Sequence, residues 1–280
     1  MIKFAHTVFA MPFAIVGYFL GITAHGSNIF CWQTLIFVIL CMVFARSAAM
    51  GFNRYIDRSI DAKNPRTENR EIPSGIMKPQ TALIFVIVNS IAFIVTCWFI
   101  NMLVFFLSPV ALLVILGYSV TKKYTALCHF VLGAGLSLAP IGAYLTVTGE
   151  FALLPVMFSF VVFLWTAGFD IIYALQDKDF DIREQLHSIP AFLGIRRALL
   201  VSGAVHIVAG LLVIIIGVFG NFGKLYAAGA GIFLFLLLYQ HLIVKPDDLN
   251  RINAAFFTSN GIAGVVFSTF VVLDLIFMNY

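Results

Sequence analysis

Long apolar runs occupy most of this chain, and they constrain its fold more than any other feature. A helix needs roughly 20 apolar residues to cross a bilayer. The runs are continuous and lack the alternation of a membrane β-strand, so helices are expected rather than a barrel. Nine runs can be placed, at residues 6–25, 33–56, 80–99, 102–121, 126–147, 152–176, 198–219, 225–244 and 255–277. We therefore expect an all-α, polytopic integral membrane protein with about nine transmembrane helices, in a single transmembrane domain over residues 1–280.

The composition agrees with a lipid surrounding. Charged residues make up 11% of the chain, against about 25% in a typical soluble domain. The net charge of +4 arises between the runs and not from a basic tail, so no nucleic-acid partner is expected. Residues 6–25 are interpreted as a retained span and not as a signal peptide. No cysteine has metal-binding or CxxC spacing, and free thiols are expected at Cys31, Cys41, Cys97 and Cys128.

The basic residues predict the orientation of the chain. Fifteen of the 17 Lys and Arg residues precede the first run or accompany the connections after the second, fourth, sixth and eighth runs; the exceptions are Arg46 and Lys224. Because positively charged loops stay in the cytoplasm, we expect the N-terminus and these connections on the cytoplasmic side of the plasma (inner) membrane. Two of the connections, about 57–79 and 177–197, are too long and polar to be simple turns and are interpreted as cap loops.

Each cap loop begins with a cluster of oxygen-bearing side chains. Asn53, Asp57 and Asp61 are spaced at i, i+4 and i+8, which places them on one stripe of a helix, and Asp177 and Asp181 repeat the i, i+4 spacing. Hard oxygen ligands of this kind are the ones that Mg²⁺ takes. One cluster alone is equally typical of a solvated loop. Two clusters on the same side of the membrane favour a site for two Mg²⁺ ions.

Basic and phenolic side chains accompany the acidic clusters. Cations near a metal site can hold the outer oxygens of a diphosphate. The candidates are Arg58, Arg66, Arg70 and Lys178. Tyr118 and Lys122 lie one turn apart at the end of the fourth run, where both can reach the same phosphate. The alternative for this pair is an interfacial Tyr beside a snorkelling Lys.

Two charged residues lie deep within apolar runs, where an unpaired charge is costly. Arg46 precedes Asn53 by seven residues, and Asp170 precedes Asp177 by seven residues. One hypothesis places both at the floor of a cavity, with one of them touching substrate. The alternative is that Arg46 and Asp170 form an ion pair that only joins two helices.

These segments together resemble the UbiA superfamily of intramembrane prenyltransferases. The resemblance is carried by Asn53-x-x-x-Asp57-x-x-x-Asp61, Asp170-x-x-Tyr173-Ala174-x-x-Asp177-x-x-x-Asp181, Arg66-Thr67-x-Asn69-Arg70-x-x-Pro73-Ser74-Gly75 and Tyr118-x-x-x-Lys122. It implies a UbiA-type fold, with the helices around a central cavity that the cap loops cover. It also implies that Mg²⁺ and the diphosphate of an isoprenoid donor bind at Asn53, Asp57, Asp61, Asp177 and Asp181, with Asp170 nearer the acceptor.

The opening stretch, residues 3–14, resembles family members of bacterial quinone pathways. The expected reaction is therefore transfer of a polyprenyl group from a polyprenyl diphosphate to an aromatic acid acceptor such as 4-hydroxybenzoate, in ubiquinone or menaquinone biosynthesis. Asp57, Asp177 and Asp170 are the catalytic candidates: metal ions stabilise the departing diphosphate, and Asp170 orients the acceptor or removes the ring proton. Arg46 is a candidate for holding the acceptor carboxylate.

Other functions are compatible with parts of the sequence. Another acceptor of the menaquinone route is the main alternative within the family. A secondary transporter would place its charged residues near the membrane midplane, whereas the acidic clusters here lie near the cytoplasmic edge. An intramembrane phosphotransferase would carry a glycine-containing aspartate motif, which the sequence lacks.

Overall fold

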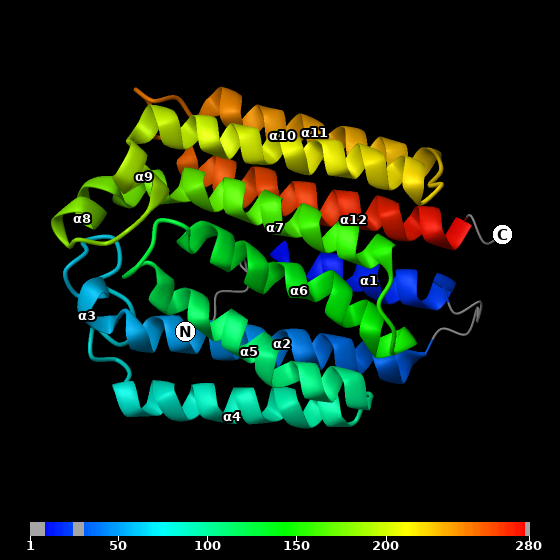
Figure 1. The fold of residues 1–280 in the computed structure, drawn as a ribbon. Coiled ribbons are helices and arrows are strands. Elements are labelled where there is room, and N and C mark those ends of the chain that lie inside the picture. Colours follow the sequence, from blue (N-terminus) through cyan, green and yellow to red (C-terminus); the bar gives the residue numbers. More distant parts are fainter. Residues whose placement is uncertain (1–8, 25–30, 278–280) are drawn as a thin grey trace.

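The computed structural model describes residues 9–24 and 31–277, and long helices dominate it (Figure 1). The long helices are α1 (Met11–Ala24), α2 (Trp32–Ile56), α4 (Pro79–Trp98), α5 (Met102–Thr121), α6 (Cys128–Thr148), α7 (Leu153–Ala174), α10 (Ile195–Phe219), α11 (Lys224–Ile243) and α12 (Asn260–Phe277). The short elements are α3 (Arg58–Asp61), the 3-10 turn η2 (Leu175–Asp177), α8 (Lys178–Arg183), α9 (Ile189–Leu193) and the π-helical turn η3 (Ala254–Ser259).

The expectation of an all-α membrane protein is confirmed. Within the described residues, eight helices are long and apolar enough to cross a membrane, and α1 is a shorter apolar helix. Large apolar side chains cover outer helix faces, such as Leu113 and Leu200, each 73% exposed. The protein is a multi-pass integral membrane protein. The first predicted span, 6–25, lies partly outside the described residues, and α10 begins at Ile195, inside the second predicted cap loop.

Local sequence signals explain several helix ends. The Asn101 side chain accepts a hydrogen bond from the Val104 N–H at 2.8 Å and so caps α5. Pro79 lies in the first turn of α4, where a backbone N–H is not needed. Gly149 follows α6 with φ of 68°, the left-handed conformation that ends many helices. The side chain of Asn260, the first residue of α12, donates to the carbonyl of Ala255 in the π-helical turn η3 at 2.8 Å.

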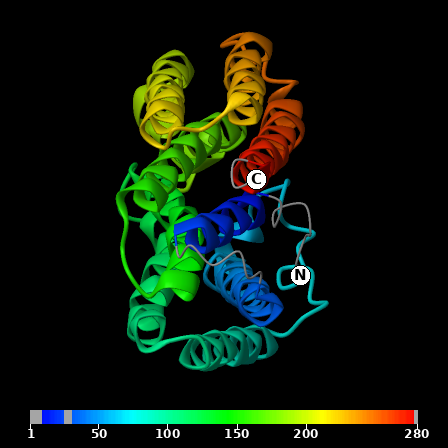
Figure 2. The same cartoon turned by 90° about the vertical axis from the view of Figure 1, so that its right-hand side faces the viewer.

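The long helices form a closed ring. Going around it, α2, α4, α5, α6, α7, α10, α11, α12 and α1 follow one another as packed neighbours, and α1 closes the ring against α2. Figure 2 looks along the bundle and shows α1 near its middle, where it also packs on α6. This second contact requires a glycine, because a side chain at Gly17 would collide with the carbonyl of Pro140. The α1–α6 contact divides the ring into two halves.

The two halves are filled differently. The half between α7, α10, α11, α12 and α1 has a core rich in aromatic rings, and Phe13, Trp165, Phe233 and Phe267 are completely buried in it. The half between α1, α2, α4, α5 and α6 encloses an apolar cavity of about 320 Å³. Because the other half is densely packed, this cavity does not reflect loose packing of the whole protein. It indicates room for a ligand.

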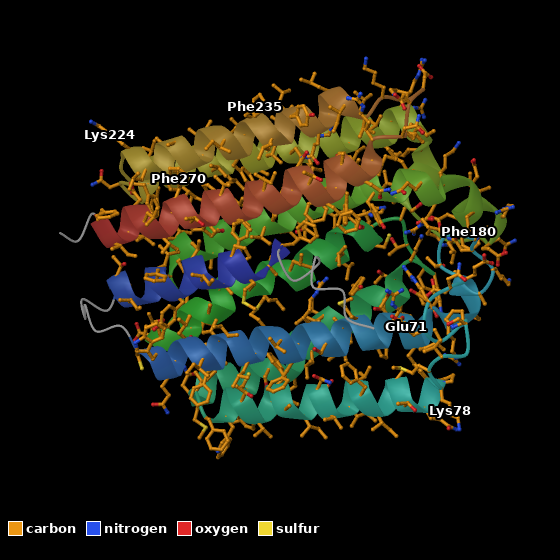
Figure 3. The ribbon with its side chains drawn as sticks, turned by 180° about the vertical axis from the view of Figure 1, so that it is seen from behind. Glu71, Lys78, Phe180, Lys224, Phe235 and Phe270 are labelled. Atoms are coloured by element: carbon orange, nitrogen blue, oxygen red, sulfur yellow. The ribbon has the colours of Figure 1, made fainter. Side chains whose placement is uncertain are left out.

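The connections after α2, α5, α7 and α11 all lie at one end of the bundle, because successive spans alternate in direction. The short helices α3, α8 and α9 lie at this end, which we call the cap end (Figure 1). Figure 3 shows Glu71, Lys78 and Phe180 at the cap end and Lys224 at the other. The Lys and Arg residues of these connections thus share one end of the molecule, as the sequence predicts.

Candidate active site

A polar cavity of about 300 Å³ lies at the cap end. Its walls come from the ends of α2, α5 and α7, the beginning of α6, the first cap loop and the π-helical turn. Members of both acidic clusters line it together with other charged and polar residues: Arg46, Asn53, Asp57, Asp61, Arg66, Arg70, Tyr118, Lys122, Asp170 and Asp177. Two stretches that are far apart in the sequence therefore meet at one cavity.

The first acidic cluster keeps one carboxylate that has no ion-pair partner among the described residues. Asn53 donates from Nδ2 to Oδ2 of Asp57 at 2.8 Å. Burial, and then the nearby Asp61 carboxylate, raise the pKa of Asp57 to about 6. Asp61 itself accepts from Nη1 of Arg70, at 2.7 Å to Oδ1 and 2.8 Å to Oδ2. The local charge at Asp57 is thus only partly neutralised.

Asp177, of the second cluster, is held by the first cap loop. Arg66 donates to it from two nitrogens, from Nε to Oδ1 at 3.0 Å and from Nη2 to Oδ2 at 2.5 Å. Asn64 donates to Oδ1 of Asp177 at 3.3 Å. The remaining Arg66 nitrogen, Nη1, donates to the hydroxyl of Tyr173 at 3.0 Å, and the Tyr173 ring stacks on Phe256 with 4.0 Å between centroids. Arg66 therefore joins the two cap segments.

Asp181 does not reach the polar cavity. Its side chain is completely buried, with Nζ of Lys122 at 2.7 Å from Oδ1 and the Ser188 hydroxyl donating to Oδ2 at 2.8 Å. Burial, the largest single influence, lowers the pKa of Lys122, but Asp181, Asp177 and Cys128 together raise it more, so the net pKa lies above the ordinary value and the ammonium stays charged. Of the five predicted metal ligands, Asp181 is the one that lies behind the cavity wall.

Asp170 lines the cavity from α7 and has a histidine as its partner. Nδ1 of His129 lies 2.6 Å from Oδ2 of Asp170. The alternative in which Arg46 pairs with Asp170 is wrong for the described chain, since no ion pair joins them. Nε of Arg46 is buried without a hydrogen-bond partner among the described residues. Both residues line the polar cavity, as the cavity-floor hypothesis predicts.

Two of the predicted phosphate-binding residues point elsewhere. Arg58 is exposed, donates to the carbonyl of Tyr55 at 2.6 Å and lies over the Tyr55 ring. Lys178 has its Nζ 3.7 Å from the exposed carboxylate of Asp179. Neither residue lines the polar cavity. Their positions on the cap surface follow from helix geometry, because each directly follows a cavity-lining aspartate and so faces a different side.

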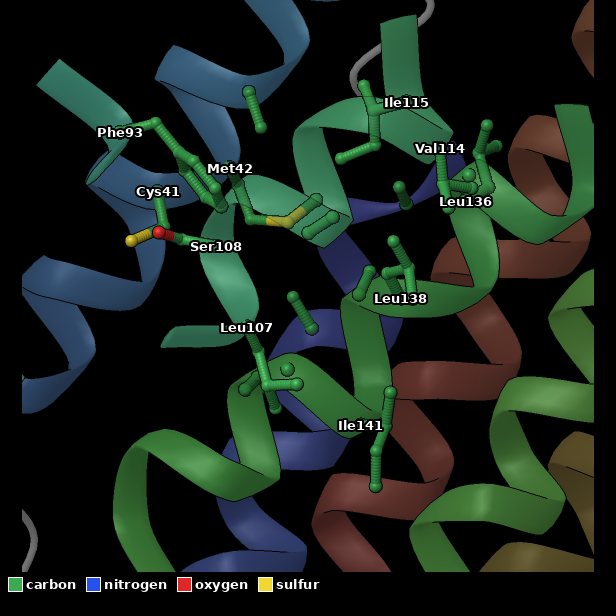
Figure 4. Close-up of a pocket in the computed structure, with 18 of the residues that line it drawn as sticks. Cys41, Met42, Phe93, Leu107, Ser108, Val114, Ile115, Leu136, Leu138 and Ile141 are labelled. Carbon is green, nitrogen blue, oxygen red and sulfur yellow. The ribbon is translucent and has the colours of Figure 1, made fainter. Parts of the chain in front are cut away.

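The apolar cavity continues from the polar one. Both are lined by Arg46, Met50, Tyr118, Leu132 and Leu136, so they share a wall. Figure 4 shows apolar side chains around this space, drawn from several helices, including Met42, Phe93 and Ile141. A charged head and a long apolar tail of one ligand could thus bind in neighbouring spaces.

Comparison with known proteins agrees with this geometry. A model described as the UbiA prenyltransferase family matches residues 10–261. The chain belongs to the UbiA prenyltransferase family. The 4-hydroxybenzoate octaprenyltransferase of Aliivibrio salmonicida is 31% identical over 247 residues, which cover 84% of this chain and 82% of that protein.

Solved structures of UbiA homologues share the fold. The apo structure of a homologue from Aeropyrum pernix K1 has a TM-score of 0.88 at 28% identity and covers 98% of this chain and 99% of that chain. A homologue from Archaeoglobus fulgidus bound to GPP and Mg²⁺ has a TM-score of 0.75 at 20% identity, covering 96% of this chain and 95% of that chain. The predicted family and the UbiA-type fold are confirmed.

The side chains at the polar cavity are of the chemical type that binds a divalent cation. Asn53, Asp57, Asp61 and Asp177 present hard oxygen donors to one cavity, as Mg²⁺ requires. Within the described residues, no three His, Cys, Asp or Glu side chains are close enough to hold an ion. At both Asp61 and Asp177, a guanidinium contacts the two carboxylate oxygens. Metal binding there would require these arginines to move aside.

Sequence reasoning missed three residues at the site. A lone His129 on an apolar helix carries no spacing signal. Asn64 lies in the first cap loop among other polar residues and is indistinguishable from them. Phe256 lines the cavity from a π-helical turn. Of these three, Phe256 lies in a predicted run, 255–277, in which the sequence offered no candidate site residue.

Proposed function

We propose that this protein transfers a polyprenyl group from an isoprenyl diphosphate to an aromatic acid acceptor, such as 4-hydroxybenzoate, in quinone biosynthesis. The observation that carries the proposal is the shared wall between a cavity lined with carboxylates and guanidinium groups and an apolar cavity. A diphosphate suits the first and a polyprenyl tail suits the second. The similarity to 4-hydroxybenzoate octaprenyltransferases supports this acceptor.

The diphosphate would be held at the cap end by Mg²⁺, which neutralises its charge as it departs. We assign two ions, with Asn53, Asp57, Asp61 and Asp177 as ligands. Asp181 completes the predicted set and reaches the site only if its pairing with Lys122 opens. The Archaeoglobus fulgidus homologue bound to GPP and Mg²⁺ supports the use of a divalent metal.

Basic residues contribute to binding the diphosphate. Arg66 and Arg70 already neutralise carboxylates in the cavity, so they can transfer their hydrogen bonds to the phosphate oxygens when metal takes their place. Lys122 and Tyr118 line the cavity from the end of α5 and face the same space. Arg58 and Lys178 stay predicted phosphate ligands, although here they lie outside the cavity wall.

The acceptor would bind between the two cavities. Arg46 lines both and offers a guanidinium whose Nε has no partner in the described chain, which suits the carboxylate of an aromatic acid. Asp170 lies on the same cavity and can orient the acceptor or accept the proton released from its ring. The aromatic walls shield the allylic cation from water and favour its charge.

We further propose that the cap end lies on the cytoplasmic side of the plasma (inner) membrane. The supporting observation is that the basic connections lie at this end. A reporter fused after Tyr280 is expected to read outside the cytoplasm, since α12 runs away from the cap end. A cytoplasmic reading would reverse the orientation.

The function is tested with purified protein in lipid nanodiscs. The protein is incubated with a labelled polyprenyl diphosphate, a panel of hydroxybenzoates and naphthoates, and either Mg²⁺ or a chelator. We expect a prenylated hydroxybenzoate that forms only with divalent metal. If no acceptor is prenylated, or if the yield is unchanged in chelator, the proposal fails. Uptake of an aromatic acid into vesicles without chemistry would instead indicate a transporter.

A further inference from the structure

A buried histidine in the first turn of α6 has both ring nitrogens in hydrogen bonds. The side chain of His129 is 2% exposed. The backbone N–H of Ile189, in the second cap loop, donates to Nε2 of His129 at 3.3 Å. Because an N–H can only donate, Nε2 accepts in this contact, and the proton that faces Asp170 is on Nδ1. Nδ1 therefore donates to Oδ2 of Asp170 at 2.6 Å.

The cap segment that holds His129 is itself fixed. Ser188 is completely buried and caps α9, where its hydroxyl accepts from the Ala191 N–H at 3.3 Å. The same hydroxyl donates to Asp181, which is paired with Lys122. The position of the neighbouring Ile189 N–H is therefore determined by the buried Lys122–Asp181–Ser188 contacts. Through its bond to Asp170, His129 connects this fixed segment to α7.

Asp170 is left with one oxygen for a ligand. Oδ2 is taken by His129, whereas Oδ1 accepts no hydrogen bond from any residue that the structure describes. The Asp170 side chain is 22% exposed and lines the polar cavity. A hydroxyl of a bound molecule could donate to Oδ1 while His129 keeps the carboxylate from rotating.

We propose that His129 is a positioning residue for the aromatic acceptor: its imidazole holds the Asp170 carboxylate and ties it to the second cap loop. The proposal rests on the proposed function, in which Asp170 is next to the acceptor. The second cap loop would then do more than help to bind the diphosphate. The same loop that contains the buried Asp181 would also set the orientation of the Asp170 carboxylate. A histidine that only filled space in the core would not need hydrogen bonds from both ring nitrogens, to Asp170 and to the Ile189 N–H.

Three substitutions separate the two hydrogen bonds. His129→Asn keeps an N–H donor close to the position of Nδ1 and loses the acceptor for Ile189. His129→Gln keeps an acceptor close to the position of Nε2 and loses the donor to Asp170. His129→Leu removes both. His187→Leu is the matched control, because His187 lies in the same cap loop and its side chain is exposed.

The readouts are KM for the acceptor, KM for the polyprenyl diphosphate and acceptor affinity measured by calorimetry without donor or metal. We expect His129→Leu and His129→Gln to weaken acceptor binding by about tenfold to 100-fold, the range for a lost hydrogen bond to a charged group. KM for the donor should change by less than about twofold, and His129→Asn should recover acceptor affinity to within about threefold of the wild type. His187→Leu should match the wild type.

Two results would overturn the inference: unchanged acceptor affinity in His129→Gln, or equal losses in His129→Asn and His129→Gln. If His129→Leu does not fold, the Asn and Gln variants still decide. A wild-type protein that binds no aromatic acid would instead refute the proposed function. A wild type that binds acceptor, with variants that bind it equally well, refutes only the role of His129.

Discussion

The two acidic clusters have the same spacing and very different surroundings. In each, aspartates one turn apart follow a membrane helix, and one of them is held by an arginine of the first cap loop: Asp61 by Arg70 and Asp177 by Arg66. The other members differ. Asp57 lines the cavity with an amide as its partner, whereas Asp181 is buried behind the wall and paired with Lys122.

The difference shows that spacing sets which face a carboxylate occupies, and that distant elements set its charge environment. Lys122 comes from the end of α5 and forms its ion pair with Asp181 of the second cluster. Asp57 of the first cluster has no ion-pair partner among the described residues, and burial and Asp61 raise its pKa although Lys123, Lys122 and Arg70 act in the opposite direction. The electrostatic energy of binding a divalent cation should therefore be most favourable at the first cluster, where the negative charge is least compensated.

The largest expected effect is loss of activity when a cavity-lining aspartate is neutralised. Asp57→Asn and Asp177→Asn should each lower kcat/KM by about 10³-fold, because each removes a charged metal ligand worth several kcal/mol. Asp179→Asn is the control, since Asp179 lies in the same segment with a side chain that is 91% exposed. Prenyl transfer in nanodiscs measures all three. Wild-type rates in both Asp57→Asn and Asp177→Asn would remove the metal site from this cavity.

The next effect is on stability, and it should be confined to the second cluster. Lys122→Met leaves Asp181 buried and unpaired, which should cost about 3–5 kcal/mol of unfolding free energy. Adding Asp181→Asn should restore most of it. Lys63→Met is the comparison: its partner Glu184 is near the surface, so the cost should be about 0–1 kcal/mol. Unfolding in detergent measures the changes, and equal losses for the two lysines would contradict the comparison.

A smaller effect should distinguish the two arginines. Arg66 uses Nε and Nη2 on separate oxygens of Asp177, whereas Arg70 uses Nη1 alone on Asp61. A lysine can replace a single nitrogen but not a planar fork. Arg66→Lys should therefore raise KM for the diphosphate about tenfold or more, and Arg70→Lys by about threefold or less. The opposite order would show that the fork at Asp177 is not used in the substrate complex.

The smallest effect concerns pH. The folded protein holds a proton on Asp57 up to about pH 6, against 3.8 for the free side chain. Since the folded state binds this proton more tightly, the contribution of Asp57 to the stability of the metal-free protein should fall as the pH rises from about 4 to about 6. The change should be about 1 kcal/mol or less, because the carboxyl is partly exposed and screened. Asp57→Asn should remove this slope in thermal unfolding, and Asp179→Asn should keep it.

The sequence predicted the fold well because a span is encoded locally. Run length and the position of basic residues determined the helices and their shared end without any tertiary contact. The site was predicted in part. Asp57, Asp61 and Asp177 were found because i, i+4 spacing is visible in the sequence. The bond from His129 to Asp170 joins α6 to α7, and nothing in the local sequence of either helix signals it.

Contacts from distant elements explain both the wrong alternative for Asp170 and the incomplete prediction for Asp181. The alternative in which Arg46 pairs with Asp170 considers only those two charges, whereas in the structure His129 contacts Asp170 and Nε of Arg46 has no partner among the described residues. Asp181 was expected beside Asp177 because of its spacing. A short 3-10 turn precedes α8 and the segment turns inward, so that Ser188 and Lys122 surround it.

Ring closure has a consequence for biosynthesis of the protein. Helix α12 follows all the other spans in the chain, yet it packs on α1, and Phe9 meets Phe256 with 5.5 Å between ring centroids. A nascent polypeptide that has released only α1 to α11 into the bilayer still lacks Phe256, which lines the polar cavity, and the helix that closes the ring against α1. A premature stop after α11 would thus yield an inserted but inactive product, with every acidic residue of the two clusters in place.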